Sequence, residues 1–218
     1  MRFPSAAGLL GLIVAAAGCG SSSEPRPTPR YGYGTPDLAQ VASQFHDDAQ
    51  TNSKATGDQI PLKFTDSEGK AVDLASFRGK RNVVLVVVKG MPTSPGGVFC
   101  PGCLAQIHSL TANYDEFKKR DAEIVMVFPG PTDKLPEFLS TAKVDGAGGN
   151  KKVPFALLLD QDLKAVELLG IRGDLAKPST YILDKQGNAV FAFVGESTAD
   201  RPSVKALLAQ LDKLNAKT

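Results

Sequence analysis

Runs of apolar residues alternate with turn residues along most of the chain and predict a mixed α/β domain. Two short segments, 60–64 and 71–74, flank the turn residues 66–69 and predict a β-hairpin. The valine-rich run 83–88 has no polar position, which is typical of a strand buried on both faces. Apolar residues at helical spacing follow over 103–119. The pattern therefore predicts a hairpin, a central strand and a helix in the first half of the domain.

The remaining pattern continues the alternation and closes with two strands and a helix. The sequence predicts strands over 123–128 and 155–159 and short helices over 135–143 and 163–169. It then predicts a hairpin over 180–183 and 189–194 and a last helix that buries Val204, Leu207, Leu208, Leu211 and Leu214. Alternation followed by a ββα unit predicts a mixed central β-sheet with helices on both faces.

The N-terminus has the pattern of an export signal. Arg2 precedes an uncharged apolar centre, 6–18, which is shorter than the roughly 20 residues of a membrane-spanning helix. Small residues directly before Cys19 resemble the lipobox of bacterial lipoproteins, although Ala16 stands where leucine is usual. The resemblance implies a signal peptide over 1–18, a lipid on Cys19, and a domain anchored to a bacterial membrane in the cell envelope, facing the periplasm or exterior. A signal peptide cut elsewhere and an uncleaved anchor are the alternatives.

A tether and extension over 19–57 separate this signal from the domain, which we place at 58–218. Serines and prolines up to residue 36 exclude a helix or a strand ladder there. Residues 37–54 carry apolar positions at helical spacing and predict one amphipathic helix. The apolar face of that helix would hold Leu38, Val41, Ala42 and Phe45.

The composition of the chain argues against several classes of function. The chain has 218 residues, of which 42% are hydrophobic and 22% charged, so it supports a packed core. A net charge of +2 argues against a nucleic-acid-binding protein. Three cysteines are too few for a disulfide scaffold, and two histidines make a histidine-rich metal site implausible. No nucleotide-binding loop, serine-hydrolase motif or HExxH metal motif occurs, and we expect no cofactor.

The strongest chemical signal is the sequence Cys100-Pro101-Gly102-Cys103 at the predicted start of a helix. The helix dipole and free N–H groups there stabilise a thiolate, so the pair can exchange between dithiol and disulfide. A zinc site needs about four ligands, and c-type haem attachment needs a histidine where Leu104 stands. A structural disulfide is the remaining alternative.

Three segments carry a family resemblance. The strand 83–88 leads through Lys89-Gly90 to the sequence FCPGCLAQ at 99–106, and KPSTYILDKQG at 177–187 and DRPS at 200–203 follow. Together they resemble the alkyl hydroperoxide reductase/thiol-specific antioxidant (peroxiredoxin-like) branch of the thioredoxin superfamily. The resemblance implies a three-layer thioredoxin-like fold and a cis peptide bond before Pro178, which would lie against the cysteine pair.

The resemblance leaves the reaction open. Many peroxiredoxins place a threonine three residues before the peroxidatic cysteine, and Gly97 stands there if Cys100 attacks. An apparent insertion, 91–98, precedes the pair. We therefore expect first a membrane-tethered thiol–disulfide oxidoreductase in which Cys100 attacks and Cys103 resolves, acting on protein thiols or disulfides with an external thiol reductant. A thiol peroxidase with the same two roles and a non-catalytic module with a structural disulfide are the alternatives.

Other polar residues are weaker candidates. Four of them could handle protons or stabilise an anion: Lys89, His108, Arg172 and Glu196. Each is more plausibly a surface or helix-face residue.

Overall fold

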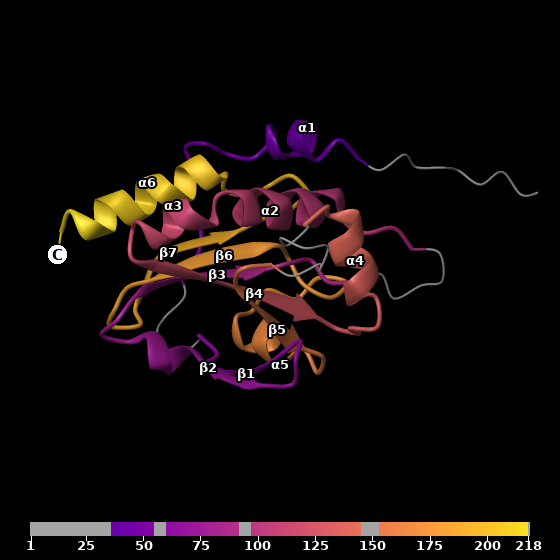
Figure 1. The fold of residues 1–218 in the computed structure, drawn as a ribbon, viewed down its shortest axis with the longest axis horizontal. Helices are drawn as coiled ribbons and strands as arrows, with labels where there is room; N and C mark the ends of the chain where they lie inside the picture. The colour runs from indigo at the N-terminus through magenta and orange to yellow at the C-terminus, as the bar shows by residue number, and fades with distance from the viewer. Residues whose placement is uncertain (1–35, 55–59, 92–96, 145–152, 218) are drawn as a thin grey trace, which may run out of the picture. The chain divides into compact units, whose positions relative to one another are not determined.

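A seven-stranded mixed β-sheet is the centre of the computed structural model, which describes residues 36–54, 60–91, 97–144 and 153–217 (Figure 1). The strand order is β2-β1-β5-β4-β3-β6-β7. The strands are β1 (Lys63–Asp66), β2 (Ala71–Asp73), β3 (Asn82–Val87), β4 (Ala122–Pro129), β5 (Ala156–Asp160), β6 (Ser179–Leu183) and β7 (Ala189–Val194). The predicted mixed sheet with an N-terminal hairpin is confirmed.

The sheet is parallel in the middle and antiparallel toward both edges. β4 pairs in parallel with β3 and with β5, whereas β6, β7, β1 and β2 pair antiparallel with their neighbours. All six residues of β3 are buried, as expected for a β-branched run covered on both faces. The chain leaves this central strand at Val87 and reaches the cysteine pair before α2.

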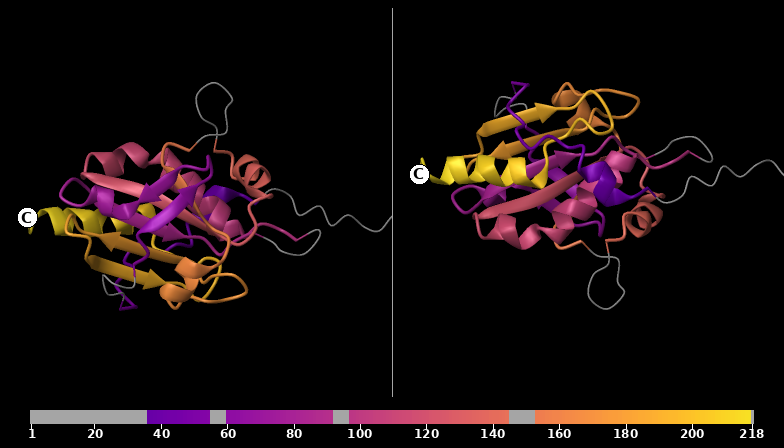
Figure 2. Two further views of the ribbon diagram at one scale, coloured as in Figure 1. Left: turned by 90° about the horizontal axis from the view of Figure 1, so that it is seen from below. Right: turned by 90° about the horizontal axis from the view of Figure 1, so that it is seen from above.

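Helices cover both faces of the sheet, and each face has its own apolar core. One core holds Val84 and Val86 of β3 together with side chains from α1, α2, α4 and α6, and the other holds Val83, Leu85 and Val87 with α5. Seen from above, α1 and α6 lie in front of the sheet, and from below the hairpin β1–β2 does (Figure 2). The helices are α1 (Leu38–Ala42), α2 (Pro101–Ala112), α3 (Tyr114–Lys118), α4 (Leu135–Thr141), α5 (Lys164–Leu168) and α6 (Val204–Asn215), with a 3₁₀ turn at Leu74–Phe77. None of the helices within the described ranges is long and apolar enough to cross a bilayer.

The predicted helix over 103–119 is two helices, α2 and α3. It is interrupted at Asn113, whose side-chain amide donates a 2.8 Å hydrogen bond to the carbonyl of Ser109. Asparagine side chains compete in this way for backbone groups and favour helix ends over helix interiors. Phe117 of α3 is buried in the core.

The segment before the domain is part of the packed structure. Its apolar side chains are buried as predicted at Leu38 and Phe45, and α1 lies on α2. The predicted single helix over 37–54 is wrong, because α1 ends at Ala42. Beyond it the backbone bonds to other parts of the chain: the His46 N–H donates to the Arg201 carbonyl, and the Asn52 N–H donates to the Ala192 carbonyl. These tertiary partners replace the helical hydrogen bonds.

Some predictions fall outside the described residues. They are the signal peptide, the lipid site at Cys19, the Ser/Pro-rich tether, and the central part, 92–96, of the predicted insertion.

Burial of the N-terminal segment predicts that it stabilises the domain. Replacing Phe45, which is 8% exposed, by alanine should lower the free energy of unfolding by about 3 kcal/mol, because the ring leaves a cavity over the sheet. Leu168→Ala, at a side chain that is 47% exposed, is the control and should cost less than about 0.5 kcal/mol. Urea denaturation followed by circular dichroism measures both. Equal losses would contradict a structural role for the segment.

Candidate active site

The two cysteines occupy the first turn of α2. Cys100 is the N-cap residue, half-buried, and its Sγ accepts a 3.4 Å hydrogen bond from the Cys103 N–H. Cys103 is fully buried, and its Sγ accepts a 3.4 Å hydrogen bond from the Lys89 N–H at the end of the central strand. Pro101 takes the first helical position, where no N–H is needed. Both thiols are free in this structure, which is therefore that of the reduced pair.

Arg201 is the third member of the site, and sequence reasoning missed it as a functional residue. Its side chain is only 1% exposed. Its Nη2 lies 3.1 Å from Cys103 Sγ and 3.5 Å from Cys100 Sγ. Its Nη1 donates to Gln106 Oε1 and its Nε donates to the Thr198 carbonyl. The DRPS motif is part of the family resemblance, but nothing in the linear sequence indicates that its arginine reaches the cysteine pair, which lies about a hundred positions earlier in the chain.

The guanidinium of Arg201 is surrounded by neutral oxygen acceptors and the two sulfurs. Among the described residues, no Asp or Glu oxygen forms an ion pair with Arg201. A buried charge is costly unless another charge or strong hydrogen bonds compensate it. Gln106, itself fixed by a 3.4 Å hydrogen bond to Thr180 Oγ1, provides a neutral acceptor. The group that can provide a negative charge is the thiolate of the cysteine pair.

The environment separates the two thiols in acidity. The hydrogen bond from the Cys103 side chain and the charge of Arg201 lower the pKa of Cys100 to about 5. Burial raises the pKa of Cys103 well above its ordinary value. At neutral pH the half-buried sulfur is therefore the nucleophilic thiolate, while the buried sulfur keeps its proton. The roles of Cys100 as attacking and Cys103 as resolving cysteine stay a prediction, which this difference in acidity favours.

Gly102, between the cysteines, lets the Arg201 loop approach the helix start. A Cβ atom at Gly102 would lie 1.9 Å from the Thr198 carbonyl oxygen, which is far inside contact distance. The loop 195–203 thus packs directly on the cysteine motif, and the same carbonyl accepts the Arg201 Nε hydrogen bond. The glycine of this motif is required by tertiary packing.

The peptide bond before Pro178 differs from the expectation. No peptide bond among the described residues is cis, so the implied cis bond before Pro178 is wrong. The trans chain extends the pairing of β6 and β7 by one step, because the Gly195 N–H donates a 2.8 Å hydrogen bond to the Pro178 carbonyl. That Pro178 lies against the cysteine pair stays a prediction, whereas the Arg201 side chain reaches both sulfurs.

The weaker candidates have other partners. Lys89 contributes its backbone N–H to Cys103, while its ammonium pairs with the exposed Asp174. The side-chain partners of the others are Lys177 for Glu196, Glu167 for Arg172 and the Ala142 carbonyl for His108. Within the described residues, no group of three or more His, Cys, Asp or Glu side chains converges to hold a metal ion.

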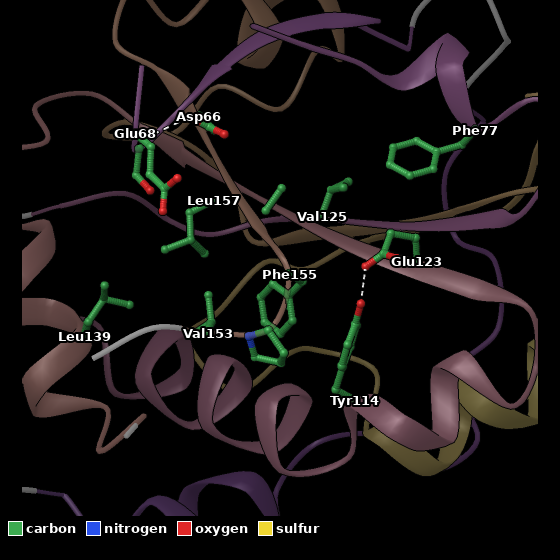
Figure 3. Close-up of a pocket in the computed structure, with 13 residues that line it drawn as sticks. Asp66, Glu68, Phe77, Tyr114, Glu123, Val125, Leu139, Val153, Phe155 and Leu157 are labelled. Carbon is green, nitrogen blue, oxygen red and sulfur yellow. Dashed lines mark hydrogen bonds between the residues drawn. The ribbon is translucent and has the colours of Figure 1, made fainter. Parts of the chain in front are cut away.

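A cavity of about 450 Å³ opens beside Cys100. Its wall is largely apolar, with Met91, Phe99 and Leu175, and Lys89 stands at its side. A larger cavity of about 630 Å³ lies elsewhere and contains neither cysteine (Figure 3). There Tyr114 donates a 2.6 Å hydrogen bond to Glu123. Burial raises the pKa of Tyr114, and this hydrogen bond raises it further. A small substrate can reach the Cys100 thiolate through the cavity beside it.

Fold and site together define a thioredoxin-like domain that carries a reactive cysteine pair at a helix N-terminus. The AhpC/TSA family matches residues 56–192. The chain belongs to the AhpC/TSA family, which confirms the resemblance of its motifs.

Known relatives agree with this assignment. The chain is 32% identical over 141 residues to chloroplastic peroxiredoxin Q of Sedum lineare, covering 62% of this chain and 67% of that one. It is 31% identical over 140 residues to the same protein of Triticum aestivum, covering 62% and 57%. It is 30% identical over 124 residues to peroxiredoxin Bcp of Escherichia coli, covering 56% and 69%. The match thus spans between 57% and 69% of the length of these relatives.

Solved structures confirm the fold. Peroxidoxin BcpB of Mycobacterium tuberculosis aligns with a TM-score of 0.54 at 18% identity, covering 78% of this chain and 99% of that one. Peroxiredoxin Q of Xanthomonas campestris aligns with a TM-score of 0.53 at 18% identity, covering 76% and 99%. The predicted three-layer thioredoxin-like fold is confirmed.

The position of Arg201 predicts how the site titrates. Iodoacetamide should alkylate Cys100 with a rate that rises through about pH 5 and is constant above pH 7, because the reactive form is the thiolate. Arg201→Ala should move this midpoint upward by about 1 to 2 pH units, because the neighbouring positive charge is lost. Arg172→Ala, at an exposed arginine, should leave the midpoint in place. An unchanged midpoint in Arg201→Ala would show that the guanidinium does not stabilise the thiolate.

Proposed function

We propose that the chain is a thiol peroxidase in which Cys100 reduces hydroperoxides and Cys103 resolves the oxidised cysteine. The observation that carries the proposal is the buried guanidinium of Arg201, which contacts both sulfurs and has no carboxylate partner among the described residues. Membership of the AhpC/TSA family and relatives named peroxiredoxin support it. These findings favour the peroxidase over the membrane-tethered oxidoreductase that we expected first.

The first step is oxidation of Cys100. Its thiolate attacks one oxygen of the hydroperoxide ROOH, the O–O bond breaks, and the sulfur becomes a sulfenic acid, Cys–SOH. The leaving alkoxide takes up a proton and departs as ROH. Negative charge moves from sulfur to the leaving oxygen during this step, and a fixed cation beside the sulfur stabilises it throughout. Arg201 is placed to do this, since Gln106 and Thr198 hold its other nitrogens.

The second step is resolution by Cys103. Its sulfur attacks the Cys100 sulfenic acid, an S–S bond forms, the S–O bond breaks, and water leaves with the proton of the thiol. Burial protects the Cys103 thiol until then, and the Lys89 N–H stabilises charge on its sulfur. An external thiol reductant then returns the disulfide to two thiols. Neither step calls for a metal or an organic cofactor.

Thiol–disulfide exchange is the second candidate function. Gly97, an exposed residue, stands where many peroxiredoxins carry a threonine, and the neighbouring Val98 side chain is 66% exposed beside the cavity. A half-buried thiolate next to an open apolar surface also suits attack on a disulfide of a partner protein. This function uses the same pair, with Cys100 forming the mixed disulfide.

Stopped-flow oxidation separates the two functions. With hydrogen peroxide, the reduced protein should be oxidised at least about 10²-fold faster than a free thiol at the same pH, because Arg201 stabilises the transferred charge. Cys100→Ser should abolish the reaction. Cys103→Ser should still form the sulfenic acid, which dimedone traps, but no disulfide. A rate no faster than that of the free thiol, together with rapid reduction of a peptide disulfide, would replace peroxidase by exchange.

We also propose that the mature protein is a lipoprotein held in the cell envelope through Cys19. Small residues before a cysteine at the end of a short apolar stretch support the proposal. Expressed in a bacterial host with its full N-terminus, the wild-type protein should sediment with membranes. A radioactive fatty acid supplied to the host should label the wild-type protein and leave Cys19→Ser unlabelled, with its Cys100 chemistry intact. Equal labelling of both proteins would contradict a lipid at this residue.

A further inference from the structure

The segment after α1 crosses the loop that carries Arg201. We call residues 43–54 the N-terminal strap. The His46 N–H donates a 2.8 Å hydrogen bond to the Arg201 carbonyl, and the Ser203 N–H donates a 2.9 Å hydrogen bond to the His46 carbonyl. These two bonds form a parallel bridge between His46 and Pro202. His46 therefore bonds the main chain at Arg201 through its N–H and at Ser203 through its carbonyl.

The side chain of His46 holds the same loop at a second point. Its Nε2 lies 2.9 Å from Asp200 Oδ1, and its ring packs against Phe193 with a centroid separation of 5.9 Å. The other oxygen of Asp200 accepts a 2.8 Å hydrogen bond from the Glu196 N–H, which closes the loop on itself. Both carboxylate oxygens of Asp200 are thus engaged.

This arrangement affects the charge at the sulfurs. Asp200 is the sequence neighbour of Arg201, and a carboxylate with a free oxygen would compete with the thiolate for the guanidinium. His46 and the Glu196 N–H keep that carboxylate occupied while the guanidinium points to the cysteines. The pair is half-exposed, with 46% of the His46 side chain and 28% of the Asp200 side chain accessible, so it contributes little to stability. The pair acts instead by fixing the position of the loop that carries Arg201.

We propose that His46 is a positioning residue for the chemistry of Cys100: it fixes the Asp200–Ser203 loop so that the Arg201 guanidinium stays on the two sulfurs. A residue of the extension that precedes the domain thereby becomes part of the active-site support. The inference rests on the proposed function only in taking the Cys100 thiolate as the reacting group. Its readout is the titration of that thiolate, which is measurable whether or not the protein reduces peroxides.

The test compares alkylation profiles of Cys100 in the full-length reduced protein. Iodoacetamide labelling across pH 4 to 9, resolved by peptide mass spectrometry, gives the midpoint for Cys100 separately from the other cysteines. His46→Ala should raise this midpoint by about 0.5 pH unit or more, because the freed Asp200 oxygen draws the guanidinium away. His46→Gln places an amide nitrogen near the position of Nε2 and should restore the wild-type midpoint.

The matched control removes another contact of the strap. Gln210 of α6 donates a 3.2 Å hydrogen bond to the Ala49 carbonyl without touching the Arg201 loop. Gln210→Ala should leave the midpoint within about 0.2 pH unit of wild type. A shift as large as that of His46→Ala would mean that any loosening of the strap has this effect, and would overturn a specific role for His46.

A double-mutant cycle decides whether His46 acts through Arg201. In an Arg201→Ala background, adding His46→Ala should change the midpoint no further, because the group that it positions is gone. The same shift in both backgrounds would overturn the proposal, as would an unchanged midpoint in His46→Ala alone. Thermal unfolding of each variant is recorded alongside. If His46→Ala does not fold, His46→Gln and His46→Asn provide the comparison, since only glutamine reaches Asp200.

Discussion

A buried guanidinium opposite two sulfur atoms is the constraint on which the site depends. Arg201 is almost completely enclosed, and among the described residues no carboxylate compensates its charge. Leaving such a charge unbalanced is costly, so the folded state favours a thiolate beside it. The hydrogen bond to Gln106 and the close approach of the loop at Gly102 hold this group in place, and its charge adds to the Cys103 hydrogen bond in lowering the pKa of Cys100.

The sheet and helix architecture makes this constraint possible. The buried central strand β3 delivers the chain to Lys89, whose N–H meets Cys103, and the first turn of α2 presents both sulfurs at one helix end. From the other end of the domain, β7 and the loop before α6 return Arg201 to the same point. The site is thus assembled where a parallel strand–helix unit meets the antiparallel terminal unit. This also explains why the reactive sulfur is accessible and its partner is not.

The strap adds a third part of the chain to this assembly. Residues that precede the family-matched region at 56–192 bury Leu38 and Phe45 and then bridge to Pro202. The described part of the extension and the loop that carries Arg201 are therefore linked through backbone hydrogen bonds. His46, the residue proposed to position Arg201, lies in this segment and outside the matched family region.

The sequence by itself predicted the strands, the last helix and the position of the cysteine pair at a helix start. The valine run, the two hairpins and the amphipathic last helix are each readable because burial imposes a period on local sequence. The sequence CPGC was sufficient to predict a redox pair at a helix start. Tertiary structure alone decided the ending of α1 at Ala42, the trans bond before Pro178 and the placement of Arg201 and His46. These depend on partners far away along the chain, and local periodicity carries no information about which distant groups will satisfy a backbone N–H or a buried charge.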